Sequence, residues 1–452
     1  MIHKIYGEIL KFTLAEIISA TGAKLIWGEE ISGKFEISTD TRTIKENDIY
    51  LPLRGENFDG HTFIPNALNS GAIGYFTQNE KVVDKNAKFV LYVKNSLVAY
   101  LELANYIRNK INPKIIAITG SSGKTTVKEM MSSVLATTFK THKSKLNHNN
   151  EIGLCQTMFL MPEDTEVAVV EFGMRNLGEI ELLAKYLEPN IGIITNIGTA
   201  HVERLGSVEN IATAKCEILD YIKQDGAFVS IKDEKVISRA KKFDFEKNFL
   251  SLEDVKNIEI AKNYTSFVWQ DEKYELQIEG EHNIENALLV MRTAEILGVS
   301  TENIKKGLWN FHQIEKRWEI TNHNGLTFIN DSYNANPESM KAVLKTFLSV
   351  YRAPVYLVLG DMAELGKDEI KYHKEIGAFL NNYEDVKLLT VGDLAKFICQ
   401  NTKIEAHHFN SHKECAQYIA DNCESGATLL FKASRVMQFE KIIEEIKNYD
   451  NV

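Results

Sequence analysis

Short apolar runs alternate with helix-type patterns over the middle and last parts of the chain. The runs cover residues 115–118, 167–170, 191–194 and 227–231, and later 355–359, 387–391 and 428–431. Strands that are apolar throughout, and that are separated by helices, are typical of parallel sheets covered on both faces. The pattern therefore predicts an α/β fold.

The same pattern predicts three domains. About 110 residues of short strand and helix patterns come first, and they include turn signals over 54–61. A helical pattern over 97–110 ends before Pro113, and the strand pattern that starts the second domain follows it. Near Trp318 the alternation restarts and predicts a Rossmann-like α/β domain. We expect a small α/β domain, a central phosphate-loop domain and a Rossmann-like domain over 1–111, 112–318 and 319–452.

Composition and charge narrow the classes of protein. The chain has 452 residues, 44% of them hydrophobic and 25% charged, which is typical of a folded protein of several domains. A formal net charge of −10 argues against nucleic acid or an anionic membrane as the main partner. Five cysteines without a C-x-x-C pair suit reduced thiols. With neither a signal-peptide pattern nor a run of ~18 apolar residues, a cytoplasmic protein without membrane insertion is expected.

The segment 115–126 combines an apolar strand, a glycine turn and the start of a helix. Its polar part reads Gly120-Ser121-Ser122-Gly123-Lys124-Thr125-Thr126. Glycines let backbone N–H groups converge on an anion, the lysine adds a mobile cation, and the first threonine can ligate Mg²⁺. The loop is a variant, because the first glycine of G-x-x-x-x-G-K-[ST] is replaced by Ile118. It predicts a magnesium nucleoside triphosphate site, the alternative being a glycine turn before an ordinary helix.

Three polar residues follow strands of the predicted central sheet, where ligands of open parallel sheets collect. Glu171 follows the run 167–170, His201 lies shortly after 191–195, and Lys215 lies in a helical segment beyond it. For Glu171 a magnesium ligand and a surface acid are equally good interpretations. On their own, His201 would more often be a structural histidine and Lys215 a solvated helix lysine.

Two further polar segments precede helices. The turn 280–287 opens a long apolar helix, and Asn283 and Asn286 could cap that helix or contact a purine ring. The segment 330–337 follows an apolar run and is either a turn network or a ligand cradle.

Read together, these segments resemble the Mur ligases over essentially the whole chain. The resemblance lies in ten ordered segments: Asp40–Arg42 with Gly55–His61, Thr119–Thr126, Asn149–Gly153, Glu171–Gly173, Asn196–His201, Ala214–Glu217, Gly280–Ala287, Asp331–Asn336, Gly360–Gly366 and Lys432–Arg435. The last departs from the family's usual Lys-Gly-Ser-Arg, because Ala433 replaces the glycine.

The resemblance implies roles around the nucleotide. Lys215 resembles the lysine that these ligases carry as a carbamate, and with His201 it would hold a second Mg²⁺, while Thr125 and Glu171 hold the first. The nucleotide site would comprise Gly120, Ser121, Ser122, Gly123, Lys124, Thr125, Thr126, Asn283, Asn286, Arg317 and Asp331. Lys124, Lys215, His201 and Arg317 would be the catalytic residues.

It also implies substrate sites in the outer domains. In the first domain the uridine-diphosphate site would comprise Ser38, Thr39, Arg42, Asn57, Asp59 and His61. Asn149 and Asn150 of the central domain are further expected substrate contacts. The region of the third domain that receives a dipeptide would include Asn334, Asn336, Asp361 and Glu364.

The implied activity is an ATP-dependent amide-bond ligation in cytoplasmic peptidoglycan precursor synthesis. D-alanyl-D-alanine would be added to UDP-N-acetylmuramoyl-tripeptide through an acyl phosphate, with release of ADP and phosphate, by a monomer. Alternatives are folylpolyglutamate synthase, which would start near its phosphate loop, and the Mur ligase that adds the third residue, which would carry an Asp-Asn-Pro-Arg motif. A non-catalytic nucleotide-gated scaffold is the alternative from another class.

Overall fold

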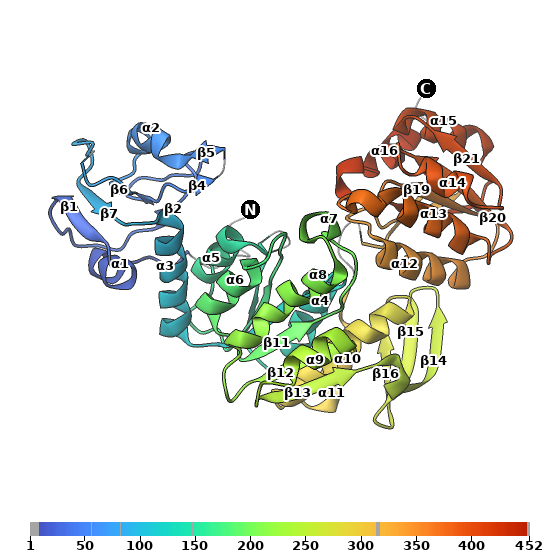
Figure 1. The fold of residues 1–452 in the computed structure, drawn as a ribbon, viewed down its shortest axis with the longest axis horizontal. Coiled ribbons are helices and arrows are strands. Elements are labelled where there is room, and N and C mark those ends of the chain that lie inside the picture. The colour runs from blue at the N-terminus through green and yellow to red at the C-terminus, as the bar shows by residue number, and fades with distance from the viewer. Residues whose placement is uncertain (1–8, 56, 82, 146–147, 313–316, 450–452) are drawn as a thin grey trace. The chain divides into compact units, whose positions relative to one another are not determined.

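Parallel sheets with intervening helices dominate the architecture, so the predicted α/β class is confirmed (Figure 1). The computed structural model describes residues 9–55, 57–81, 83–145, 148–312 and 317–449. Glu56, within one of the segments quoted above, lies outside them. The chain divides into two units, described in turn: residues 1–117, 139–172 and 182–190, and residues 118–138, 173–181 and 191–452.

The first unit opens with a five-stranded sheet of order β1-β7-β6-β3-β2, in which only β1 pairs antiparallel with its neighbour. Its elements are α1 (Leu14–Thr21), β1 (Lys24–Gly28), β2 (Ile37–Ser38), β3 (Ile49–Tyr50), the hairpin strands β4 (Arg54–Gly55) and β5 (Phe58–Asp59), α2 (Ile64–Asn69), β6 (Gly74–Thr77), β7 (Phe89–Tyr92) and α3 (Ser96–Ile111).

Helix α3 confirms the helix predicted over 97–110. The Asn95 side chain accepts a hydrogen bond from the Val98 N–H and so caps its start. At its end Asn112 adopts a left-handed conformation directly before Pro113, which cannot continue a helix. Strands β8 (Lys114–Thr119), β10 (Val167–Glu171) and β9 (Thr141–Lys143) are neighbours in one sheet, in that order. Along the chain, α5 (Glu151–Phe159) lies between β9 and β10, and α6 (Glu179–Leu187) follows β10.

The second unit contains the helix that leaves the phosphate loop, α4 (Lys124–Leu135), and the parallel strands β11, β12 and β13. The elements that follow along the chain are β11 (Ile191–Ile194), α7 (Val202–Leu205), α8 (Val208–Cys216), β12 (Ala227–Ile231), α9 (Glu234–Ala240), β13 (Glu246–Leu250), β14 (Val255–Ala261), β15 (Tyr264–Trp269), β16 (Glu272–Leu276), α10 (Glu281–Ile296) and α11 (Thr301–Trp309).

Strands β14, β15 and β16 form an antiparallel three-stranded sheet that the sequence pattern did not predict. Continuous apolar runs identified strands such as β8, β10, β11 and β12, whereas β14 reads Val-Lys-Asn-Ile-Glu-Ile-Ala and is largely exposed. An antiparallel sheet with one solvated face does not need an apolar run.

The C-terminal sheet has the order β17-β18-β22-β19-β20-β21. Only β17–β18 is antiparallel. Its elements are β17 (Glu319–His323), β18 (Leu326–Asn330), α12 (Pro337–Val350), β19 (Val355–Gly360), α13 (Glu369–Leu380), β20 (Val386–Val391), α14 (Lys396–Gln400), β21 (Ala406–Phe409), α15 (His412–Asn422), β22 (Thr428–Lys432) and α16 (Glu440–Tyr449).

Helices cover both faces of this sheet, as expected for a Rossmann-like arrangement (Figure 1). Successive side chains of a strand point to opposite faces. Leu357 and Leu359 of β19 accordingly belong to the core under α12 and α13, and Tyr356 and Val358 to the core under α15 and α16. The two cores fix the strand ends that carry the C-terminal loops.

Gly307→Ala should lower the free energy of unfolding by about 1–3 kcal/mol, because overpacking a close helix contact is destabilising. A methyl group at Gly307 of α11 would lie 2.3 Å from the Val134 Cα of α4. On an unpacked helix the same change would stabilise by about 1 kcal/mol. Denaturant unfolding of the full chain measures the effect, with the exposed neighbour Lys306→Ala as control. A raised unfolding midpoint for Gly307→Ala would contradict the packing.

Candidate functional site

The turn between β8 and α4 needs both of its glycines. Gly120 has φ +152° and Gly123 φ +79°, conformations that favour glycine. A Cβ at Gly120 would lie 1.8 Å from Thr195 Oγ1, and one at Gly123 would lie 2.7 Å from Asn286 Oδ1. The loop backbone therefore runs directly against two polar side chains.

Residues that follow β11 hold this loop in place. The Ser121 N–H donates to the Asn196 backbone oxygen at 3.1 Å, and the Ser122 N–H donates to Asn196 Oδ1 at 3.0 Å. Asn196 Nδ2 donates to Ser122 Oγ at 2.8 Å, and the Thr195 hydroxyl donates to the Ser122 backbone oxygen at 2.5 Å. Gly198 adds a bond from its N–H to Ser121 Oγ at 2.9 Å. The loop is thus shaped by one neighbouring segment.

Sequence reasoning did not single out Thr195 or Asn196 as site residues. Both stand directly after a predicted strand, the same position that drew attention to Glu171. That position was the available signal for their role.

Cationic and hydroxyl groups gather at the start of α4, where Lys124, Thr125 and Thr126 are the first three residues. Lys124 Nζ donates to the Gly120 backbone oxygen at 2.8 Å. Arg317 Nη2 donates to Thr125 Oγ1 at 3.1 Å, and the Arg317 guanidinium carbon lies 4.1 Å from the Tyr333 ring centroid.

This arrangement suits a phosphate group. Arg317 Nε is buried and finds no hydrogen-bond acceptor among the described residues. An anion would supply that acceptor, and the loop glycines with the helix start provide the cradle. The geometry therefore fits the nucleotide phosphates predicted for this loop.

Lys215 on α8 is buried, with 1% of its surface exposed, so the solvated-lysine interpretation is wrong. Burial lowers the pKa of its amine well below the usual range, and the nearby charge of Lys124 adds to this effect. The neutral form of Lys215 is therefore favoured, and neutral amines are nucleophilic.

His201 Nδ1 and Glu364 Oε2 are in close polar contact. Both residues have left-handed backbone conformations, with φ +66° and +62°. The hydrogen bond with His201 lowers the pKa of the Glu364 carboxyl group. The Glu203 N–H donates to the Glu364 backbone oxygen at 3.2 Å, so the contact between the two segments has backbone support.

Glu171 belongs to the first unit, whereas Thr125, His201 and Lys215 belong to the second. Asn149 Nδ2 donates to Glu171 Oε1 at 3.2 Å, and the Glu171 N–H donates to Ser144 Oγ. Asn150 is the N-cap of α5. The described residues contain no cluster of three His, Cys, Asp or Glu side chains suited to a metal. A magnesium ion here would need hydroxyl, carbamate or phosphate oxygens, which are donors it favours.

The capping interpretation of Asn283 and Asn286 is wrong. Helix α10 starts after Gly280 without a side-chain cap. Both asparagines are buried, with Asn283 Nδ2 bonded to the Glu279 backbone oxygen and Asn286 Nδ2 to Asn283 Oδ1. Asn286 lies against the phosphate loop at Gly123, which places the pair beside it.

In the C-terminal sheet, polar side chains hold the loops. Asn334 Oδ1 accepts from the Ala335 N–H, and Asn336 caps α12 with its side chain. Asp361 accepts from two backbone N–H groups, those of Leu394 and Ala395. These bonds show that segment 330–337 is at least a turn network.

Buried Lys432, the last residue of β22, is bonded to the loop that follows β18. Its Nζ donates to Asp331 Oδ2 at 2.5 Å and to the Asn334 backbone oxygen at 3.2 Å. The adjacent Ala433 is fully buried, and a Cβ added at Gly360 would lie 2.8 Å from its methyl carbon. The same Cβ would lie closer still, at 2.4 Å, to the Phe439 ring, so glycine at 360 on the neighbouring strand leaves space that both the alanine methyl group and the phenylalanine ring use.

The predicted uridine-diphosphate residues lie in the first unit, on strand ends, turns and one short 3-10 helix. Ser38 Oγ donates to the Asp40 backbone oxygen, and exposed Arg42 makes a bidentate pair with the Asp40 carboxylate. Asp59 accepts from Arg54 and is bonded to His61 Nδ1 at 2.7 Å. Thr39 shares a hydrogen bond with the Tyr100 hydroxyl, and Asn57 is exposed. The Arg42 and Arg54 guanidinium groups are exposed, and each is paired with a nearby aspartate.

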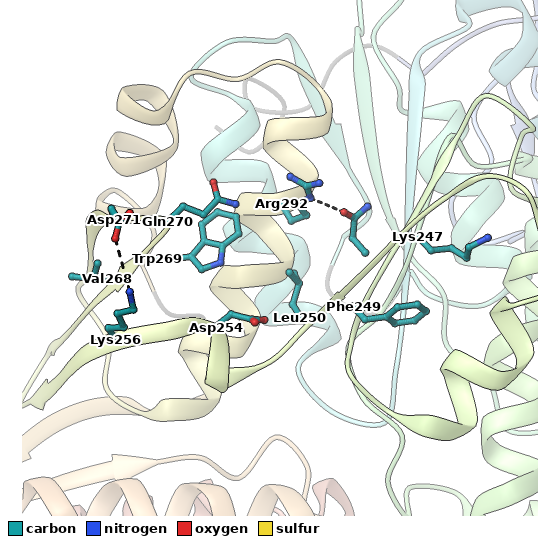
Figure 2. Close-up of a pocket in the computed structure, with 11 residues that line it drawn as sticks. Lys247, Phe249, Leu250, Asp254, Lys256, Val268, Trp269, Gln270, Asp271 and Arg292 are labelled. Atoms are coloured by element: carbon teal, nitrogen blue, oxygen red, sulfur yellow. Dashed lines mark hydrogen bonds and ion pairs between the residues drawn. The ribbon is translucent and has the colours of Figure 1, made fainter.

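A recess of about 600 Å³ lies elsewhere in the second unit, between β13, the three-stranded sheet and α10 (Figure 2). None of the predicted site residues lines it. Its cations are engaged within the protein, since Arg292 donates to Asn248 Oδ1 at 2.7 Å and Lys256 lies 4.0 Å from Asp271. Charges of both signs line it, so it favours no class of ligand.

Three domain models of one protein family match most of the chain. The Mur ligase family catalytic domain matches residues 36–118, the Mur ligase middle domain 118–294, and the Mur ligase glutamate ligase domain 316–435. The chain belongs to the Mur ligase family, as the resemblance predicted.

Individual relatives are similar over nearly their full length. The UDP-N-acetylmuramoyl-tripeptide–D-alanyl-D-alanine ligase of Bacillus subtilis is 36% identical, over 91% of this chain and 92% of that protein. The crystal structure of MurF from Acinetobacter baumannii has a TM-score of 0.91 at 28% identity, over 97% and 99% of the chains. The fold also matches MurF of Thermotoga maritima in complex with ADP, with a TM-score of 0.83 at 24% identity over 92% and 98%.

Asn196→Ala should weaken MgADP binding about tenfold, because the phosphate loop loses two hydrogen bonds that shape it. Isothermal titration of the full chain measures this dissociation constant. Asn303→Ala, which removes an exposed asparagine hydrogen bond on α11, is the matched control and should bind as the wild type does. An unchanged affinity for Asn196→Ala would show that the loop does not depend on this side chain.

Proposed function

We propose that this chain adds D-alanyl-D-alanine to UDP-N-acetylmuramoyl-tripeptide at the expense of ATP, in the synthesis of peptidoglycan precursors. The observation that carries this proposal is the end-to-end similarity to ligases of that name, combined with an intact phosphate loop. No described helix combines the length and apolar character needed to cross a bilayer. We further propose that the chain acts as a monomer in the cytoplasm.

The chemistry required is activation of a carboxylate, which is a poor electrophile at neutral pH. The terminal carboxylate oxygen of the tripeptide attacks the γ-phosphorus of ATP, the bond to the β,γ-bridging oxygen breaks, and ADP leaves. The amine of D-alanyl-D-alanine then attacks the acyl carbon, phosphate departs, and the amine loses a proton. Lys124 and Arg317 stabilise the charge on the transferring group.

Thr125, Glu171 and His201 are the proposed magnesium donors of this chain, together with Lys215 once it carries a carbamate. When bound, magnesium would screen the negative charges of the reacting phosphate and carboxylate groups. Oxygen donors suit this hard cation, and the buried, neutral amine of Lys215 suits reaction with CO₂. That reaction forms an N–C bond, releases a proton and leaves an anion.

Asn283, Asn286 and Asp331 are proposed contacts of the nucleoside part of ATP. The buried asparagine pair supports this assignment, since it lies against the phosphate loop.

The outer regions would take the other two substrates. Ser38, Thr39, Arg42, Asn57, Asp59 and His61 are proposed for the uridine diphosphate, which exposed Arg42 could meet by a bidentate contact. Asn149 and Asn150 are proposed near the tripeptide. Residues Asn334, Asn336, Asp361 and Glu364 are proposed for the dipeptide region, in which Asn336 and Asp361 also hold the loops.

The alternatives raised by the sequence are less well supported. A Mur ligase family catalytic domain over residues 36–118 precedes the phosphate loop, whereas a folylpolyglutamate synthase would start near it. The Asp-Asn-Pro-Arg motif of the third-residue ligase is absent from the sequence. A scaffold without turnover has no need of a buried lysine beside the phosphate-loop lysine.

The proposal predicts that ADP release from MgATP requires both UDP-N-acetylmuramoyl-tripeptide and D-alanyl-D-alanine, and that it equals the pentapeptide formed. A coupled ADP assay and mass spectrometry measure the two quantities. Lys124→Ala should reduce both by at least about a hundredfold, because a cation that stabilises the transition state is lost. Lys114→Ala, an exposed lysine at the start of β8, is the control. ADP release without either substrate would instead indicate a generic nucleotide hydrolase.

Lys215→Ala should reduce turnover to background while leaving the thermal unfolding midpoint at or above that of the wild type, because it removes a buried amine. In ¹³C-bicarbonate the wild type should show a carbamate carbon resonance that Lys215→Ala lacks. The exposed Lys232→Ala should keep both the resonance and the turnover. Near-normal turnover of Lys215→Ala would contradict the carbamate role.

A further inference from the structure

Glu338, the second residue of α12, reaches the segment that follows β11. Its Oε1 accepts from the Thr199 N–H at 3.2 Å, and its Oε2 accepts from the Thr199 hydroxyl at 2.9 Å. A Cβ at Gly198 would lie 3.0 Å from the Glu338 carboxyl carbon. The glycine therefore permits a carboxylate to approach closely and to hold both polar hydrogens of one threonine.

Thr199 belongs to the segment that shapes the phosphate loop. Three residues before it stands Asn196, which bonds Ser121 and Ser122, and one residue before it stands Gly198, which bonds Ser121 again. The path from Glu338 to the phosphate loop thus consists of one short stretch of backbone fixed by hydrogen bonds at both ends.

A second contact also joins the C-terminal region to the segment that follows β11. Glu364 pairs with His201, and a Cβ at Gly366 would lie 3.0 Å from the Glu203 Cα. Two loops at the carboxyl ends of the C-terminal strands therefore contact the segment 198–203. Of these contacts, the one made by Glu338 is with Thr199, which follows directly after the residue that bonds the phosphate loop, Gly198.

We propose that Glu338 is a positioning residue for the ligation: by holding Thr199, it couples the seating of the C-terminal sheet to the conformation of the phosphate loop. The inference rests on the proposed function. Glu338 touches no reacting atom. Its removal loosens the segment 196–199, so the loop is held in the conformation for phosphoryl transfer for a smaller fraction of the time.

Hydrogen exchange of the full chain tests the coupling without relying on activity. Glu338→Ala should accelerate amide exchange in the peptides that cover 119–126 and 195–203. Glu302→Gln is the matched control, because Glu302 is likewise the second residue of an exposed helix start, on α11. It should leave both peptides unchanged. Wild-type exchange in Glu338→Ala overturns the proposal.

Kinetics supply the second readout. Glu338→Ala should lower kcat about three- to tenfold, the scale of a partly exposed hydrogen bond to a charge. The KM for the UDP-linked tripeptide should stay unchanged, since Glu338 belongs to the second unit and the residues proposed for the uridine diphosphate belong to the first. Glu338→Gln, which keeps one acceptor oxygen, should fall between Glu338→Ala and the wild type.

A double-mutant cycle with Thr199→Val completes the test. Because one contact would be lost in either variant, Glu338→Ala and Thr199→Val together should be no slower than the worse single variant. Additive losses, or a loss of kcat without faster exchange, overturn the proposal. If the wild type forms no pentapeptide, the proposed function fails, and the exchange result still decides whether Glu338 holds the loop.

Discussion

The contact between the phosphate loop and the residues after β11 is the constraint on which the site depends. Thr195 occupies the space where any side chain at residue 120 would begin, and Asn196 bonds the next two backbone N–H groups. A loop backbone that is already fixed needs little further ordering when an anion arrives. The residues that follow β11 therefore order the phosphate loop before a ligand is present.

An acidic chain that handles anions must concentrate its positive charge. Here the formal net charge is −10, yet Lys124 and Arg317 converge at the start of α4, and Lys215 is buried near Lys124. Burial lowers the pKa of Lys215 and so disfavours its charged form, which reduces the repulsion between it and the neighbouring cation. The local field thus differs in sign from the net charge of the whole protein.

Sequence patterns predicted the features that short stretches of neighbouring residues determine. The apolar runs gave the parallel strands, and the glycines with Lys124 located the phosphate loop. The pattern did not predict the three-stranded sheet, since its strands mix polar and apolar residues without a continuous apolar run, nor the burial of Lys215, whose helix looks solvated in sequence. It also could not reveal that Glu338 meets Thr199, because residues 139 positions apart meet only through tertiary packing. Long-range contacts of this kind follow from how sheets and helices assemble, which no local pattern encodes.

The pairing of Gly360 with Ala433 changes how the departure from Lys-Gly-Ser-Arg should be read. Gly360 ends β19, and Ala433 follows directly after the paired strand β22. A methyl group at Gly360 would lie 2.4 Å from the Phe439 ring and 2.8 Å from the Ala433 methyl carbon, so the glycine leaves space that both side chains use. Alanine at 433 is therefore judged by the volume that three positions share, and a departure that looks like a lost motif residue in one alignment column is part of how that volume is filled.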